Sequence, residues 1–307
     1  MSLHGWRAPV RRLLLALCAL LIATCDASLA ATLQYCDPPA KLSADQQDRL
    51  FRFAGIVKAA LEASGHSLAL VARSGLDLGH FGVRYSHAGL SMQGSTNAPW
   101  SVRQLYYACD ERQPRVYDQG LAGFLLGLND PAAGYVSVVF LPRAEAAALE
   151  RVALDNGQAL QLLGAAYSAN AYAFGLHYQN CNQWVVEMMA AAWGRLDAGD
   201  NLRATAQAWL QDRGYQPTRF DAGVALTWLA AFVPWLHHDD HPGADLERGV
   251  FRVSMPASIE AFVQASVPGA SRMEFCLADR RVVVRRGWEP IADGCVPEER
   301  DRVITLE

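Results

Sequence analysis

Cys181 has the residue type and the local setting of a thiol nucleophile. It follows Asn180 and opens an apolar stretch with helical spacing that continues to Trp193. Unpaired backbone N–H groups and the helix dipole at such a position lower a thiol pKa, and the same N–H groups can hold the oxyanion of a tetrahedral intermediate. The competing interpretation is an inert buried thiol or half of a disulfide.

His87 is the residue that could serve as the base. It lies within a predicted strand from Tyr85 to Met92, among small residues that leave space beside the ring. An imidazole can take a thiol proton and later return it to a leaving group. A lone strand histidine is more commonly structural, and sequence spacing alone does not bring His87 to Cys181.

The residues beside the thiol offer further polar groups. Gln179 and Asn182 could donate to an oxyanion, and Asn180 could do so or could simply cap the following helix. The segment from His237 to Pro242 contains three histidines and two aspartates, but adjacent residues rarely converge on one ion. We expect a polar turn there and no metal site.

The N-terminus has the pattern of a secretory signal peptide over residues 1–30. Basic residues at 7, 11 and 12 precede the apolar run from Leu13 to Ala23, and small residues lead to a cleavage position after Ala30. The apolar run is too short to span a bilayer, and no later stretch predicts a span. We therefore expect a periplasmic or secreted protein, with lipoprotein anchoring at Cys25 as the less favoured alternative.

Export favours disulfides, and the cysteine count leaves one thiol over. Five cysteines follow residue 30. Cys276 and Cys295 flank a strand-turn segment and could form a local bridge, and Cys36 could then pair with Cys109. Sequence does not fix this pairing. If the pairing holds, Cys181 is left unpaired.

The elements that must position these residues indicate one mixed α+β domain over residues 31–307. Ser43 and Gln46 form a capping box that starts a helix ending near Gly65. Strands are expected at 67–72, 85–92, 100–108, 135–141, 251–254, 273–276 and 282–284, and helices at 144–155, 157–163, from 181, 202–213 and 222–235. The net charge of −4 and the pI near 6.1 give no footprint for nucleic acid.

Two short segments resemble the circularly permuted branch of the papain-like superfamily, which is related to NlpC-type cell-wall peptidases and to lecithin:retinol acyltransferase. They are Ser86-His87-Ala88-Gly89 and, later in the chain, Asn180-Cys181-Asn182-Gln183-Trp184-Val185. Their order agrees with that branch, as does a preceding strand that ends in Arg73. The resemblance implies a permuted papain-like (NlpC-type) domain, with an antiparallel sheet packed against helices and a C-terminal extension of helices and short strands.

The resemblance also implies further site residues. In that superfamily a polar residue on the strand after the histidine orients its ring, and Gln104 is the first choice for this role, with Asp118 and Asp110 as alternatives. Because the base comes from the strand, His177 is expected to line the pocket instead. No cofactor is implied.

Most of the mature chain also resembles an exported bacterial family known only as a domain of unknown function, which implies no activity. The matching features are Arg84-Tyr85-Ser86-His87-Ala88-Gly89, Tyr117-Asp118-Gln119-Gly120, Asn180-Cys181-Asn182-Gln183-Trp184 and Met255-Pro256-Ala257-Ser258-Ile259.

The sequence thus favours an exported thiol hydrolase or acyltransferase acting on amide, ester or thioester bonds. Export makes a cell-wall peptide, or a lipid or protein that bears an acyl group, the expected substrate. A non-catalytic module that binds a cell-envelope ligand is the main alternative. A structural protein with Cys181 in a disulfide is the third.

Overall fold

The first helix of the structure starts where its capping box predicts. Helix α2 (Ala44–Glu62) has Ser43 as its N-cap, with the Gln46 N–H donating to Ser43 Oγ at 3.2 Å and the Ser43 N–H donating to Gln46 Oε1 at 2.8 Å. Its buried side chains recur at helical spacing: Leu50, Phe53, Ala54, Val57 and Leu61. The computed structural model describes residues 42–128, 130, 132–223 and 233–306.

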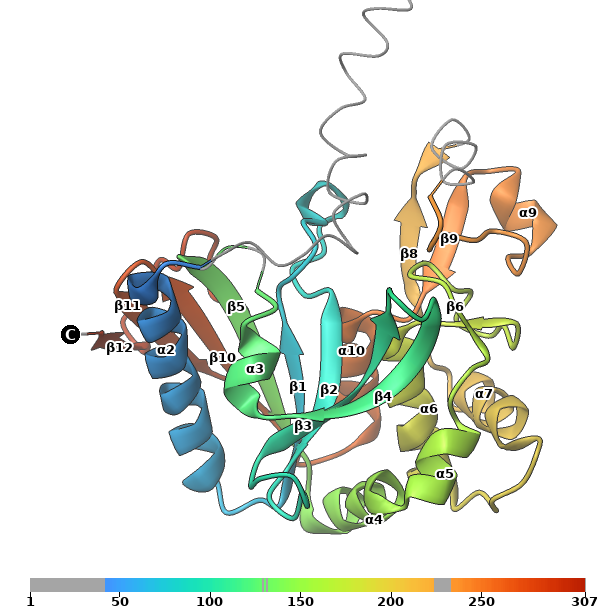
Figure 1. Cartoon of the computed structure of the whole chain (residues 1–307), viewed down its shortest axis with the longest axis horizontal. Helices are drawn as coiled ribbons and strands as arrows, with labels where there is room; N and C mark the ends of the chain where they lie inside the picture. The colour runs from blue at the N-terminus through green and yellow to red at the C-terminus, as the bar shows by residue number, and fades with distance from the viewer. Residues whose placement is uncertain (1–41, 129, 131, 224–232, 307) are drawn as a thin grey trace, which may run out of the picture. The chain divides into compact units, whose positions relative to one another are not determined.

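The β-branched and alternating segments pair into a large antiparallel sheet (Figure 1). Its order is β12-β11-β10-β5-β1-β2-β3-β4, so strands from the two ends of the chain meet at β5 and β1. The bounds are β1 (Leu68–Arg73), β2 (His87–Met92), β3 (Ser101–Ala108), β4 (Gln113–Gln119), β5 (Ala133–Phe140), β10 (Ser271–Ala278), β11 (Arg281–Arg286) and β12 (Arg302–Thr305). The mixed α+β class with an antiparallel sheet packed against helices is thereby confirmed.

Helices cover both faces of the sheet (Figure 1). One face carries Val71, Val138 and Phe275 into a core shared with α2 and with α3 (Leu121–Leu125). Alternate residues of each strand point to the opposite face, as the period of two along a strand requires. The opposite face is covered by α4 (Arg143–Leu154), α6 (Cys181–Gly194) and α10 (Pro256–Ser266). The sheet is therefore the middle of three layers.

Shorter elements complete the described fold. They are η2 (Gly79–Phe81), α5 (Asn156–Gln161), the parallel pair β6 (Ala166–Tyr167) and β7 (Tyr178–Gln179), α7 (Leu202–Asp212), the hairpin β8 (Thr218–Asp221) with β9 (Val250–Val253), and α9 (Gly243–Leu246). The predicted helix at 222–235 falls mainly on residues 224–232, which lie outside the described residues. The helices of the described ranges are too short or too polar to cross a membrane.

The cysteines divide as the odd count requires. Cys276 and Cys295 form the predicted disulfide, with their Cα atoms 5.5 Å apart. Cys109 is also disulfide-bonded, while its predicted partner Cys36 and the predicted signal segment lie outside the described residues. Cys181 is free and buried. Disulfides are consistent with an extracytoplasmic location, and the free thiol contradicts the interpretation that places Cys181 in a disulfide.

Candidate functional site

Cys181 is the first residue of α6, and Asn180 caps that helix. The Asn180 Oδ1 atom accepts the Gln183 N–H at 2.7 Å, and its Nδ2 atom donates to the Ala169 and Ser254 carbonyls, each at 3.3 Å. Of the two roles considered for Asn180, the structure shows the cap. The cap fixes the start of α6 and with it the position of the thiol.

The Cys181 thiol lies against the beginning of β2. Its sulfur is within hydrogen-bonding range of the backbone N–H groups of Cys181, Asn182 and Ala88. The ladder between β2 and β3 covers only Leu90 to Met92, so the α6 N-terminus meets β2 where that ladder has ended. Ala88 directly follows His87 in the chain, so the thiol contacts the backbone of the residue next to the predicted base, while the His87 ring itself packs against Phe124 of α3.

Asn182 forms a second link between α6 and β2. Its Nδ2 atom donates to the Ser86 carbonyl at 3.1 Å. Ser86 is itself fixed, since its N–H donates to the Arg73 carbonyl at 3.1 Å and its Oγ atom accepts the Leu76 N–H at 3.0 Å. The Asn182 amide thus attaches the start of α6 to Ser86, the residue before His87.

The His87 ring is oriented by Gln104 from the neighbouring strand. The His87 Nε2 atom and the Gln104 Oε1 atom are 2.5 Å apart, and Gln104 is 2% exposed. The ring packs edge-on to Tyr106 at 6.0 Å and against Phe124 at 5.8 Å. Gln104 therefore forms the hydrogen bond to the ring, whereas Asp118, one of its two alternatives, pairs with Arg103 at 2.5 Å.

Burial sets the protonation states of the two groups. Desolvation, followed by the positive charge of Arg73, lowers the pKa of His87 to about 3 against a smaller raising effect of the Gln104 hydrogen bond. Desolvation raises the pKa of Cys181 to about 11 although Arg73 and the three backbone N–H groups lower it. The resting site therefore contains a neutral thiol and a neutral imidazole. The low thiol pKa expected from the helix N-terminus is absent because burial outweighs the N–H groups.

Gln179 belongs to a buried polar cluster behind the site. Its Nε2 atom donates to Glu187 at 2.6 Å and to the Leu162 carbonyl at 2.8 Å, and its Oε1 atom accepts the Gly164 N–H at 2.7 Å. Glu187 is fully buried and also accepts from Arg203 at 2.9 Å. The Gln179 amide is thus fully hydrogen-bonded inside the core, where it holds the segment that leads to Cys181.

His177 lies on the surface, in a stack of rings. It is 66% exposed, and its ring stacks on Tyr178 at 4.2 Å, while His237 stacks on the same tyrosine at 4.3 Å. Tyr178 Oη contacts Asp239 at 3.4 Å. Within the described ranges no group of three His, Cys, Asp or Glu side chains has the arrangement of a metal site.

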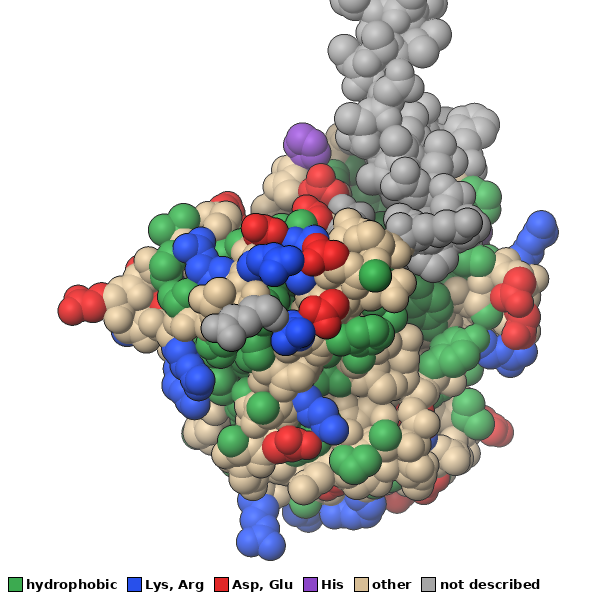
Figure 2. Space-filling model, turned by 60° about the vertical axis from the view of Figure 1, so that its left-hand side comes forward, with side chains coloured by type: hydrophobic (Ala, Val, Ile, Leu, Met, Phe, Trp, Pro, Cys, Tyr) green, Lys and Arg blue, Asp and Glu red, His purple; other side chains and the backbone are tan. Residues whose placement is uncertain are grey.

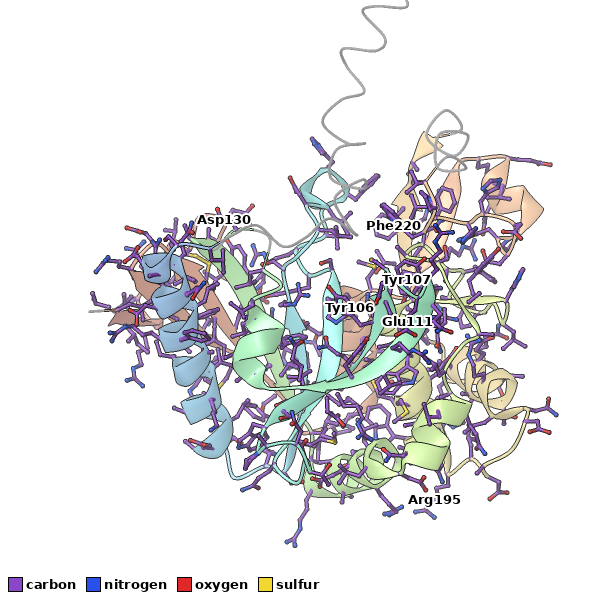
Figure 3. The ribbon with its side chains drawn as sticks, in the orientation of Figure 1. Tyr106, Tyr107, Glu111, Asp130, Arg195 and Phe220 are labelled. Atoms are coloured by element: carbon purple, nitrogen blue, oxygen red, sulfur yellow. A yellow bond between two sulfur atoms is a disulfide. The ribbon has the colours of Figure 1, made fainter. Side chains whose placement is uncertain are left out.

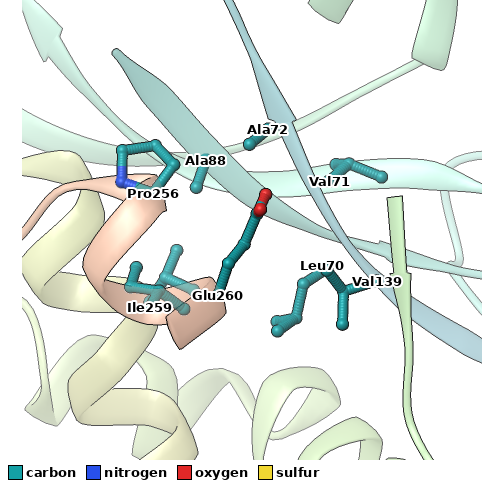
Figure 4. A pocket seen from close by; sticks show the side chains of 9 residues that line it. Leu70, Val71, Ala72, Ala88, Val139, Pro256, Ile259 and Glu260 are labelled. Atoms are coloured by element: carbon teal, nitrogen blue, oxygen red, sulfur yellow. The ribbon is translucent and has the colours of Figure 1, made fainter. Parts of the chain in front are cut away.

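A small cavity lies behind the start of β2. Ala88 and Val185 line it together with Glu260 of α10, whose side chain points from the helix toward the sheet (Figure 4). Its volume of about 10 Å³ is that of a single water molecule, which is too small for a substrate. The pKa of Glu260 is raised because the carboxylate is desolvated.

The surface nearest to His87 is aromatic. Tyr106 on β3 (Figure 3) and Tyr117 on β4 are each 44% exposed, and their rings meet edge to face at 6.3 Å. The face drawn in Figure 2 mixes basic, acidic and apolar side chains. Cys181 and His87 themselves are only 6% and 7% exposed, so both lie below this surface.

Known proteins identify this chain only at the level of the family. No curated protein and no solved structure matches it. Residues 60–263 match a bacterial family described as an uncharacterized protein conserved in bacteria, DUF2145. This range covers about two thirds of the chain and includes His87, Gln104, Cys181 and α6. The chain therefore belongs to the DUF2145 family of bacterial proteins.

Proposed function

We propose that this protein is an exported cysteine hydrolase or acyltransferase in which Cys181 is the nucleophile and His87 the base. The observation that carries the proposal is the meeting of a free thiol at a helix N-terminus with a strand whose histidine is held by a buried glutamine amide. A nucleophile, a base and a group that orients the base are the three parts that acyl transfer requires.

The chemistry follows from the neutral resting pair. His87 Nδ1 takes the thiol proton as the sulfur attacks the carbonyl carbon of an amide, ester or thioester. The carbonyl oxygen becomes an oxyanion, which the backbone N–H groups beside the sulfur, those of Cys181, Asn182 and Ala88, can stabilise. The imidazolium then protonates the leaving group as the bond to carbon breaks. Water or another acceptor, deprotonated by His87, releases the acyl group from sulfur.

The order of the elements supports a permuted papain-like arrangement for this site. A strand that begins with His87 comes first, the strand that carries Gln104 follows, and the helix that begins with Cys181 comes later. All strands of the large sheet are antiparallel to their neighbours. Substrates in keeping with export are cell-wall peptides and acyl-bearing lipids or proteins.

Acetylation by p-nitrophenyl acetate tests the proposal without knowledge of the natural substrate. We expect one acetyl group on Cys181 by peptide mass spectrometry, none there in Cys181→Ala, and slower acetylation in His87→Gln by about 100-fold, the lower end of general-base effects. His177→Gln is the matched control, because this histidine is exposed and precedes Cys181 by only four residues. Equal rates in the His87 and His177 variants would remove the base from the proposal.

A non-catalytic binding module is the second candidate, and the burial of the site favours it. A thiol that is 6% exposed with a raised pKa is typical of a structural cysteine. In that case Cys181→Ala would leave ligand binding intact, and p-nitrophenyl acetate would modify Cys181 no faster in the folded protein than in the unfolded chain.

A further inference from the structure

Gln119, the last residue of β4, contacts the amide that holds His87. The Gln104 Nε2 atom donates to Gln119 Oε1 at 2.8 Å, and the Gln104 Oε1 atom faces His87 Nε2 at 2.5 Å. A glutamine amide has one end that donates and one that accepts. When the donor end of Gln104 faces Gln119, its acceptor end must face the imidazole.

We propose that Gln119 is a positioning residue that, through Gln104, keeps the His87 proton on Nε2 and the lone pair on Nδ1. This inference rests on the proposed function, because only this tautomer leaves Nδ1 able to accept the thiol proton. If Gln104 turned over, its NH2 group would donate to Nε2, and the ring proton would move to Nδ1. With Nδ1 protonated and Nε2 accepting from Gln104, the neutral ring has no free lone pair left to take a proton.

Helix α3 keeps the Gln119 side chain in place. A Cβ atom at Gly123 would lie 2.8 Å from Gln119 Nε2 and 2.9 Å from Gln119 Cγ. Both distances are shorter than real Cβ contacts, so the glutamine occupies the space that the missing side chain leaves. The same helix supplies Phe124, whose ring packs against His87. The short helix α3 therefore contacts both ends of the hydrogen-bonded series Gln119–Gln104–His87.

Three variants separate hydrogen-bond polarity from general disturbance of the site. Gln119→Glu offers only acceptors and should preserve the orientation of Gln104, whereas Gln119→Lys offers only donors and should reverse it. Gly123→Ala places a better helix former in α3 and displaces Gln119 by contact. Gln113→Lys is the matched control, since Gln113 lies on the same strand and bonds to Glu111 on the surface.

The tautomer of His87 is read directly from the 15N shifts of its ring in the full chain, with the signal assigned by its loss in His87→Gln. We expect the Nε2–H tautomer in the wild type, in Gln119→Glu and in Gln113→Lys. We expect a shift toward Nδ1–H in Gln119→Lys and Gly123→Ala, with acetylation of Cys181 slowed by about tenfold or more.

An unchanged tautomer in both Gln119→Lys and Gly123→Ala would overturn the positioning role, whatever the rate of acetylation. A tautomer that shifts while the acetylation rate stays constant would support the positioning role and instead refute the use of His87 as the base. The two proposals can therefore fail separately.

Discussion

The thiol of Cys181 should be neutral near pH 7, and its reactivity should climb with pH as the thiolate forms. Its pKa is raised to about 11 from an ordinary value of 9.0, while that of His87 is lowered to about 3. At a pH below 9, a thiol pKa that is higher by about 2 leaves the buried cysteine with about 100-fold less thiolate than a solvated cysteine. Burial is the cause, because it outweighs the charge of Arg73 and the backbone N–H groups.

Alkylation by iodoacetamide between pH 6 and pH 10, followed by peptide mass spectrometry, measures this directly. We expect the rate at Cys181 to rise about tenfold per pH unit throughout that range, in step with the thiolate fraction. The chain unfolded in urea with its disulfides intact is the control, and its thiol should react faster and level off only above its ordinary pKa of 9.0. A plateau at Cys181 between pH 6 and pH 8 would refute the reasoning, because it would reveal a thiolate paired with an imidazolium.

Three further predictions concern stability, each read from unfolding by urea. His87 has a lowered folded pKa, so its contribution is fully present above the unfolded value of 6.5 and is lost as pH falls toward 3; His87→Gln should flatten the loss of stability across that window. Glu187→Gln should cost about 3 to 5 kcal/mol, because it leaves a buried arginine without its carboxylate, and a change under 1 kcal/mol would contradict this. Cys276→Ser opens the disulfide to Cys295, which spans 19 residues, and should cost about 3 kcal/mol at neutral pH, whereas no shift of the urea midpoint would argue against a stabilising bridge.

The elements around the site were predictable because they are buried along most of their length. The strand at β2 was expected from residue 85 and begins at His87, and the helix at α6 begins at Cys181 as the sequence indicated. Both are buried on all sides, so small and apolar residues dominate them, and the length of each run separates the strand from the helix. The disulfide between Cys276 and Cys295 was predictable because it is local.

Strand β4 was missed, and Gln119 with it. Only one of its seven residues is buried, and Pro114 lies near its beginning, as an edge strand permits. A half-exposed edge strand shows no apolar alternation, so nothing in its composition indicated a strand. The motif from Tyr117 to Gly120 was the one available signal. The depth of the site was also hidden, because a thiol pKa depends on burial that only the assembled fold reveals.

The pairing of β5 with β10 has a consequence for how the chain folds during synthesis. Phe140 of β5 is paired with Ser271 of β10, so one edge of β5 stays open until the last part of the chain has been made. Exposed valine-rich edges are prone to join other chains, and pairing between distant segments is slow. Cys181, His87 and Gln104 all precede that point. The C-terminal strands contribute none of these three side chains. Until these strands pair with β5, however, a chain that already contains all three residues keeps an exposed strand edge and can aggregate.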